Sequence, residues 1–156
     1  TDGAYLADRH TLSESYGFGC AGGNVSPEMH WEGLPDGTKS MVLTCYDPDA
    51  PTGSGFWHWV MTNIPSDATS ISEGSGNLPP GALETRTDFG VPGYSGPCPP
   101  EGDHPHRYIF TLFCLSVDAL PIEADTSAAV VGFLANMNVI EKTTLMAFSK
   151  LSLIHI

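Results

Sequence analysis

The chain has 156 residues, of which 41% are hydrophobic and 15% are charged. This composition is typical of a folded domain with a sizeable core and excludes an intrinsically disordered chain. Lys and Arg number 6 against 18 Asp and Glu, a formal net charge of −12. Because affinity for phosphate backbones depends on Lys and Arg, this charge excludes nucleic acid as a partner and disfavours an anionic membrane surface. No apolar run reaches the roughly 18 residues that span a bilayer, so we expect no transmembrane segment.

Short apolar runs separated by many of the 17 glycines and 13 prolines favour strands joined by structured loops. In chain order, hydrophobic, β-branched and aromatic residues predict strands over residues 29–32, 40–46, 56–64, 107–117 and 143–148. Residues 66–105 are dominated by turn-forming residues. Because so long a loop region is uncommon inside a compact domain, we expect it to be functional.

One helix is expected late in the chain. The pair Asp125–Thr126 offers an N-cap, and the residues that follow have helical periodicity. The apolar positions at i, i+3, i+4 and i+7 are Val130, Phe133, Leu134 and Met137. We therefore expect an amphipathic helix that packs this apolar face on the sheet. The sum is a mostly β domain, largely antiparallel, with one C-terminal helix.

The domain organisation follows from where these patterns end. Residues 1–150 are interpreted as a single domain, because no internal repeat or linker interrupts them. Residues 151–156 form an apolar tail after the last charged residue, Lys150. We interpret this tail as a non-native cloning or assembly scar.

The four cysteines differ in their surroundings. None forms a C-x-x-C pair, so a structural zinc site is not expected. Cys45 and Cys114 lie inside apolar runs and are predicted to be buried thiols, whereas Cys20 and Cys98 lie in loops rich in Gly and Pro. We predict a disulfide between Cys20 and Cys98, which implies a periplasmic or secreted protein. If the two thiols are free, a cytoplasmic location stays open.

Two carboxylates follow the strand over 40–46 in the motif D-P-D-A-P. Asp47 and Asp49 are two residues apart, a spacing that puts both side chains on one side of an extended segment. The flanking prolines restrict φ and stiffen the corner that presents them. Two interpretations are open: the pair lines a site, or the two residues only cap the turn.

Histidines and a tyrosine follow further along the chain. Alternation within its strand puts His58 on the face opposite to Trp57 and Trp59. By the same rule, His106 and Tyr108 share one face of their strand. A lone strand histidine is usually a core residue, but imidazole N–H, phenol O–H and loop N–H groups together are the donors that a small anion needs. Neighbouring aspartates would raise the pKa of the imidazoles and favour their charged form.

These motifs resemble one known family. D-P-D-A-P followed by W-H, and later G-x-C-P-P-x-G-x-x-x-H-R-Y, look like the two signature segments of the phosphatidylethanolamine-binding proteins. The phrase G-F-G-C-A-G-G-N-V-S-P-E-M-H-W, over residues 17–31, resembles their bacterial branch, often called Raf-kinase-inhibitor-like. The resemblance extends from about Gly17 to Lys150, with the motifs in the expected order.

The resemblance implies two packed β-sheets and a helix near the C-terminus. It also implies a small, pre-formed pocket for phosphate-like anions, including lipid head groups, with no cofactor. Carried over by position, the ligand-binding residues are Asp47, Asp49, His58, Gly96, Cys98, His106 and Tyr108. Arg107 is implied to serve structure by pairing with an acidic loop residue. The family normally begins with a further strand, and the segment before Gly17 is too short to supply all of it, so we expect an incomplete sheet edge.

Three functions are compatible with these residues. The first is a binding module for phosphate or phosphorylated head groups, without turnover. The second is regulation of a kinase or protease by protein contact, with an acidic or phosphorylated side chain in the same pocket. The third is a metal-assisted hydrolase with ligands among Asp47, Asp49, His58, His104 and His106. Because the sequence has no G-x-S-x-G and no H-E-x-x-H motif, we favour binding without catalytic residues or a metal.

Overall fold

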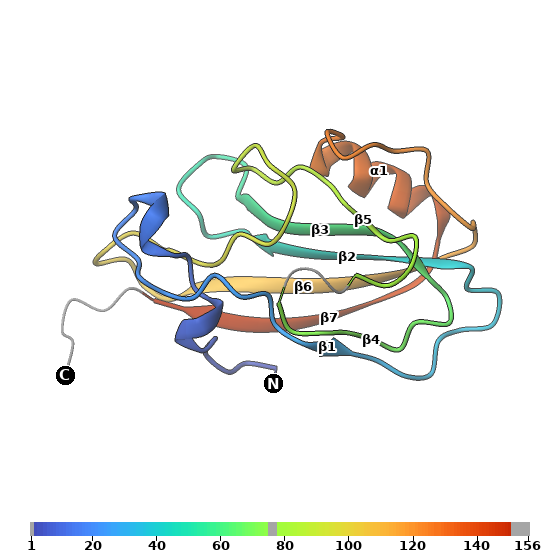
Figure 1. The fold of residues 1–156 in the computed structure, drawn as a ribbon, viewed down its shortest axis with the longest axis horizontal. Coiled ribbons are helices and arrows are strands. Elements are labelled where there is room, and N and C mark those ends of the chain that lie inside the picture. Colours follow the sequence, from blue (N-terminus) through green and yellow to red (C-terminus); the bar gives the residue numbers. More distant parts are fainter. Residues whose placement is uncertain (1, 75–77, 151–156) are drawn as a thin grey trace.

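A computed structural model describes residues 2–74 and 78–150 of the chain (Figure 1). Its main sheet has five strands in the order β5-β3-β2-β6-β7, and all neighbours are antiparallel. A second sheet pairs β1 with β4. Two short 3-10 helices, η1 (Asp8–His10) and η2 (Glu14–Tyr16), come first in the chain. The strands and the α-helix are β1 (Met29–His30), β2 (Ser40–Asp47), β3 (Phe56–Pro65), β4 (Ser70–Ile71), β5 (Leu83–Glu84), β6 (His106–Leu115), α1 (Ala128–Asn138) and β7 (Val139–Ser149). The tail over 151–156 lies outside the described residues.

The predicted fold class, two largely antiparallel sheets with one C-terminal helix, is confirmed. All five predicted strands are present, although β1 is shorter than expected and β7 begins earlier. The strand β7 begins at Val139 because the chain turns extended directly after the helix, where Val139 already has φ −72° and ψ 132°. Among the described residues of the predicted loop region, the only strands are the short β4 and β5.

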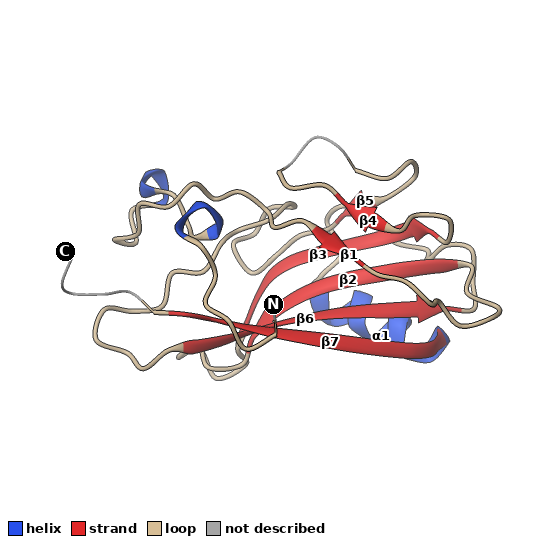
Figure 2. Ribbon diagram, turned by 90° about the horizontal axis from the view of Figure 1, so that it is seen from below, coloured by secondary structure: helices blue, strands red, loops and turns tan. Residues whose placement is uncertain are grey.

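The main sheet has a hydrophobic core on each face. Alternation along β2 sends Met41 and Leu43 into one core and Val42 into the other. The first core lies between the main sheet and the β1–β4 pair, and it contains Tyr108. The second core lies beneath α1. Figure 2 shows this arrangement, with the β1–β4 pair in front of the four long strands and the helix behind them.

The helix is present as predicted, but it presents a different face to the sheet. Its N-cap is Ser127, whose hydroxyl oxygen accepts a hydrogen bond from the amide of Val130. The buried positions are Ala128, Val131 and Ala135. Three of the four predicted core residues, Val130, Phe133 and Met137, are 48%, 64% and 66% exposed.

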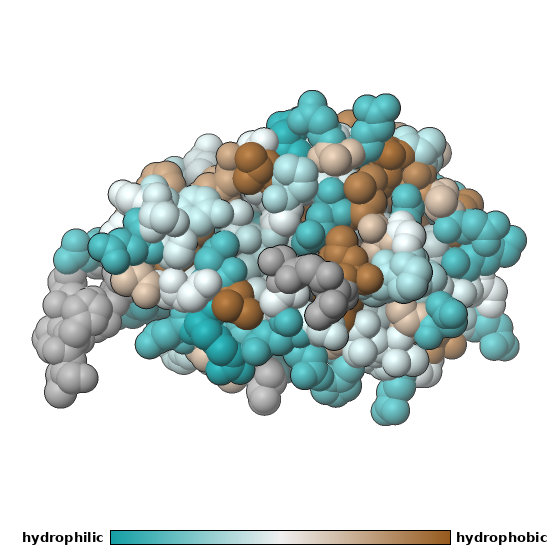
Figure 3. Space-filling view, in the orientation of Figure 1, coloured by the Kyte–Doolittle hydropathy of each residue, from teal (hydrophilic) through white to brown (hydrophobic). Residues whose placement is uncertain are grey.

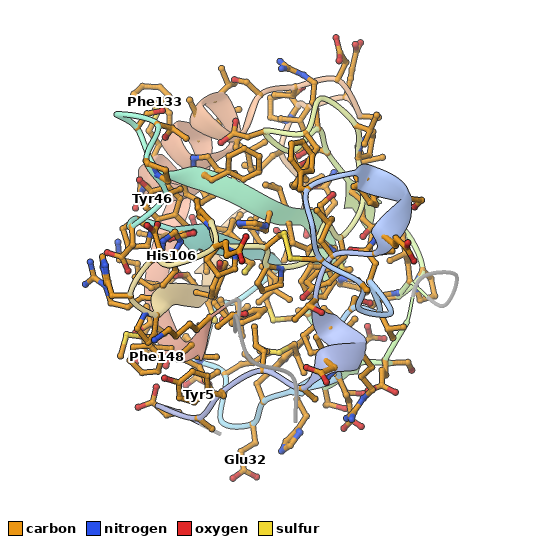
Figure 4. The ribbon with its side chains drawn as sticks, turned by 90° about the vertical axis from the view of Figure 1, so that its left-hand side faces the viewer. Tyr5, Glu32, Tyr46, His106, Phe133 and Phe148 are labelled. Carbon is orange, nitrogen blue, oxygen red and sulfur yellow. A yellow bond between two sulfur atoms is a disulfide. The ribbon has the colours of Figure 1, made fainter. Side chains whose placement is uncertain are left out.

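The choice of helix face has a physical reason. The buried set is also spaced at i, i+3 and i+7, so periodicity alone does not separate the two apolar stripes. The sheet beneath already carries the bulky side chains of Val42, Phe113 and Leu115. Small helix residues therefore allow a close approach, and the larger ones remain outside, as Phe133 does at the periphery of Figure 4.

The N-terminal segment lies along part of the outer edge of β7. Tyr5 and Phe148 form a parallel bridge, and their rings lie side by side 6.0 Å apart between centroids (Figure 4). The amide of Gly3 donates to the carbonyl of Met146 over 2.7 Å. Among the described residues, the stretch 139–145 of β7 has no strand partner on this edge.

The surface mixes hydrophobic and hydrophilic residues, and hydrophobic patches lie among hydrophilic ones on the face shown in Figure 3. No helix within residues 2–74 and 78–150 combines the length and hydrophobicity needed to cross a membrane.

Two neighbouring valines test the helix orientation. We expect Val131→Ala to lower the free energy of unfolding by about 2 kcal/mol, because it removes two methyl groups from a fully buried site. Val130→Ala is the matched control and should change it by less than about 0.5 kcal/mol, because that side chain is exposed. Urea denaturation measures both, and equal losses would contradict the orientation.

Candidate functional site

Four predicted polar residues gather around one cavity of about 270 Å³: Asp47, His58, His106 and Tyr108. Asp47 ends β2, whereas the other three lie near the starts of β3 and β6. Because β2 is antiparallel to both neighbours, its end lies beside their starts. Figure 4 looks onto this end of the sheet, where His106 lies. A larger cavity of about 740 Å³ beside the N-terminal segment contains none of the predicted site residues.

A β-bulge directs His58 into the cavity. Trp59 pairs with Cys45 and Trp57 with Tyr46, so His58 is an extra residue in β3. Trp59 belongs to the core on the cavity side, whereas Trp57 packs against the core beneath the helix. The prediction that the two tryptophans share a face opposite to His58 is therefore wrong, because a bulge interrupts the alternation of side chains.

Two carboxylates hold the ring of His106. Its Nδ1 lies 2.8 Å from Asp47 Oδ2, and its Nε2 lies 2.9 Å from Asp103 Oδ2. Burial lowers the pKa of His106, but the hydrogen bonds to Asp103 and Asp47 together raise it above the ordinary value. A ring that donates from both nitrogens is an imidazolium, so His106 is positively charged here, as the sequence predicts.

The second histidine has the opposite character. His58 is buried, and its Nδ1 donates to the carbonyl oxygen of Ser95 over 2.7 Å. Burial lowers the pKa of His58, and the Ser95 hydrogen bond and the charges of Asp47 and Asp88 only partly oppose it. The predicted charged form is therefore wrong for His58 in the free protein. Its Nδ1 carries the proton, which leaves the lone pair on Nε2 as an acceptor.

Burial and the nearby charge of Asp47 both raise the pKa of Tyr108, so its phenol stays protonated. Tyr108 lies beside His58, with 5.3 Å between the ring centroids, and is completely buried. The prediction that His106 and Tyr108 share a face is confirmed, because β6 is a regular strand over these residues. Tyr108 therefore lines the cavity with a phenol that retains its proton.

Asp49 does not point into the cavity with Asp47. Its carboxylate accepts hydrogen bonds from the backbone amide, Nε and Nη2 of Arg107, over 2.8, 3.0 and 2.9 Å. These bonds lower the pKa of Asp49 to about 2. The predicted common side is wrong because the chain leaves the strand at Pro48, where alternation no longer applies. The predicted structural role of Arg107, pairing with an acidic loop residue, is confirmed.

Two predicted loop residues have different roles. The amide of Gly96 donates to Asn24 Oδ1 over 2.7 Å, and Gly96 does not line the cavity. A Cβ at Gly96 would clash with the carbonyl oxygen of His10, so the glycine permits a close approach of two loops. Cys98 does line the cavity and forms the predicted disulfide with Cys20.

The rim of the cavity is aromatic, which the sequence did not predict. Phe89 contacts Phe56, Phe18 and His58, with ring centroids 4.8, 6.1 and 6.1 Å apart. Phe18 is two residues from Cys20, so the disulfide holds this aromatic loop at the cavity.

The sequence also did not predict a role for Asp103, which holds Nε2 of His106. In the sequence, Asp103 is marked only by its position three residues before His106. Because it lies in a loop, alternation does not predict which way its side chain points.

The residues proposed as metal ligands do not assemble. His104 is exposed and absent from the cavity, and Asp49 is occupied by Arg107. Within the described part of the chain, no three His, Cys, Asp or Glu side chains form a group able to hold a metal ion. The geometry therefore gives no support to a metal-assisted hydrolase.

A β-domain with a small cavity that is lined by a few convergent polar groups is typical of a ligand-binding protein. Residues 3–150 match the family model of the phosphatidylethanolamine-binding protein. The chain is 47% identical over 141 residues to the UPF0098 protein YbcL of Escherichia coli, covering 87% of this chain and 75% of YbcL. It is 48% identical over 136 residues to YbhB of the same bacterium, covering 85% and 84%.

The structural comparison agrees with the sequence comparison. The crystal structure of E. coli YbcL, described as a new member of the mammalian PEBP family, superposes with a TM-score of 0.92 and 43% identity. The match covers 97% of this chain and 93% of that chain. The chain therefore belongs to the phosphatidylethanolamine-binding protein family, whose members are ligand-binding proteins.

The two aspartates of the D-x-D motif should respond differently to substitution. Asp47→Asn should lower the free energy of unfolding by about 3 kcal/mol, because it removes the buried charge partner of His106. Asp49→Asn, the matched control, should cost much less, because its ion pair with Arg107 is partly exposed. Urea denaturation at neutral pH measures the difference. A larger loss for Asp49→Asn would contradict this assignment.

The disulfide closes a loop of 78 residues. We expect its reduction to lower the free energy of unfolding by about 2–4 kcal/mol, because the unfolded chain regains conformational freedom. Denaturation with and without dithiothreitol measures the loss. The double variant Cys20→Ser/Cys98→Ser is the control and should be insensitive to reductant. An unfolding midpoint unaffected by reductant in the unsubstituted protein would contradict the bond.

Proposed function

We propose that the cavity binds the anionic group of a small ligand, such as phosphate or a phosphorylated head group, without turnover. The observation that carries this proposal is the convergence of His58, His106 and Tyr108 on one cavity. Imidazole and phenol groups are donors suited to phosphate oxygens. The aromatic rim around Phe89 favours a ligand whose anionic group is attached to an apolar body.

Binding of an anion beside His58 requires the uptake or retention of a proton. In the free site, the two carboxylates of Asp47 and Asp103 outnumber the single charge of His106. The Nε2 atom of neutral His58 is an acceptor and repels an anionic oxygen. An anion therefore binds together with a proton, either on His58 or retained by the phosphate.

This coupling gives the affinity a defined pH dependence. The pKa of His58 lies below 6.5 in the free protein and rises when an anion binds. Affinity for phosphate should therefore increase as the pH falls from about 8 to about 6, by up to about tenfold per pH unit. Calorimetric titration with phosphate and phosphoethanolamine measures it, and buffers of different ionisation enthalpy report the proton uptake.

A matched histidine pair controls this experiment. His58→Ala should abolish the binding and its proton uptake, whereas His30→Ala should preserve both, because His30 is exposed and lies outside the cavity. If the unsubstituted protein gives no heat of binding anywhere in this pH range, the proposed function is refuted. Affinity that does not vary with pH would refute the role of His58.

A second candidate is regulation of a kinase or protease, in which an acidic or phosphorylated side chain of the partner enters the same cavity. The exposed aromatic ring of Phe18, 64% accessible at the cavity, favours contact with a protein surface. Phosphate should then compete with the partner in a pull-down assay. If the partner still binds at saturating phosphate, its contact with the protein does not involve the cavity.

We also propose that the protein resides in an oxidising compartment, either the periplasm or the extracellular space. The disulfide between Cys20 and Cys98 supports this location, because reducing compartments keep such thiols free. When the isolated protein is unfolded without reductant in the presence of a thiol-blocking reagent, only Cys45 and Cys114 should be modified. Modification of all four would support a cytoplasmic protein.

A further inference from the structure

We propose that Asp103 is an internal competitor for the anion site. Its carboxylate occupies the Nε2 donor of His106, and it must leave before an external anion binds there. This inference rests on the proposed function and adds a means of selecting the ligand.

The two carboxylates on His106 differ in their ability to leave. Asp47 is 3% exposed, ends a central strand, and its Oδ1 accepts a hydrogen bond from the amide of Asp49 over 2.8 Å. Asp103 is 38% exposed and belongs to the loop before β6. Its amide makes one backbone hydrogen bond, to Pro100 over 3.1 Å. Only Asp103 can therefore withdraw without disturbing the main sheet.

Withdrawal of Asp103 changes the net charge around His106. With Asp103 in place, one imidazolium faces two carboxylates, and the cluster is net negative. When Asp103 swings outward, the buried pair of His106 and Asp47 is neutral and Nε2–H becomes available. An incoming anion then gains a donor and loses a nearby like charge. The free and bound states of the site thus differ by an exchange of one anion for another at the same atom.

The same exchange discriminates between anions. Asp103 is a carboxylate tethered within reach of Nε2, so its effective concentration there is high. A free monocarboxylate such as acetate offers the same chemistry without the tether and loses the competition. A phosphate dianion carries more charge and more acceptor oxygens, so it can replace the carboxylate. Asp103 therefore selects phosphate-like anions over monocarboxylates.

The test compares two acidic residues of one loop. Asp103→Ala should bind inorganic phosphate about tenfold more tightly than the unsubstituted protein and should gain measurable acetate binding. Glu101→Ala removes the same charge from an exposed position that, unlike Asp103, has no hydrogen bond to His106, and it should change phosphate affinity by less than about twofold. Asp103→Asn retains an acceptor without the charge and should fall between the two. Calorimetry near pH 6.5 measures all four proteins.

A second measurement does not depend on a ligand. The pKa of His106, followed by NMR of its ring nitrogens, should fall in Asp103→Ala and stay unchanged in Glu101→Ala. An unchanged pKa in Asp103→Ala would overturn the inference, because the contact would then be absent in solution. Equal or weaker phosphate binding by Asp103→Ala would overturn it while leaving the proposed function intact. No phosphate binding by any of the four proteins would refute the proposed function, and the inference with it.

Discussion

The buried ion pair between Asp47 and His106 is the constraint on which the site depends. It joins the end of β2 to the start of β6, and both partners are almost completely inaccessible. A buried charge without its partner is costly, so each side chain fixes the position of the other. Through this pair the register of the central sheet determines the orientation of the imidazole, and therefore where Nε2 faces. The position of the His106 ring is thus a consequence of strand pairing, whereas loops supply the aromatic rim and Asp103.

The sequence predicts the fold better than it predicts which surfaces meet. Runs of β-branched and aromatic residues identify the long strands, because half-buried pleated surfaces require such side chains. The helix is recognisable by its period, yet its buried face was assigned wrongly. Val130, Phe133 and Met137 form one apolar stripe, and Ala128, Val131 and Ala135 form another. Side-chain volume against the sheet decides between them, and this depends on residues distant in the sequence.

For the candidate site as well, the sequence predicts the regular strands better than the positions of individual side chains. His106 and Tyr108 were placed correctly because β6 is regular there, and a period of two holds. The rule fails at His58, where a bulge adds a residue, and at Asp49, where the strand has ended. Asp103 lies in a loop, where no period exists. The residues that sequence reasoning misplaced are therefore those where the backbone departs from regular structure, and such departures are common at functional sites.

The acidity of the chain and its proposed affinity for anions are compatible because they act over different distances. At physiological ionic strength, charges more than about 8 Å apart across solvent are largely screened. Most of the net charge of −12 is therefore weakly felt inside the cavity. The carboxylates of Asp47 and Asp103, within 3 Å of the imidazole, are not screened in this way. In the proposed function, the occupant of the site is thus decided by the protonation of two histidines and the position of one loop carboxylate, while the remote charge mainly slows the approach of an anion.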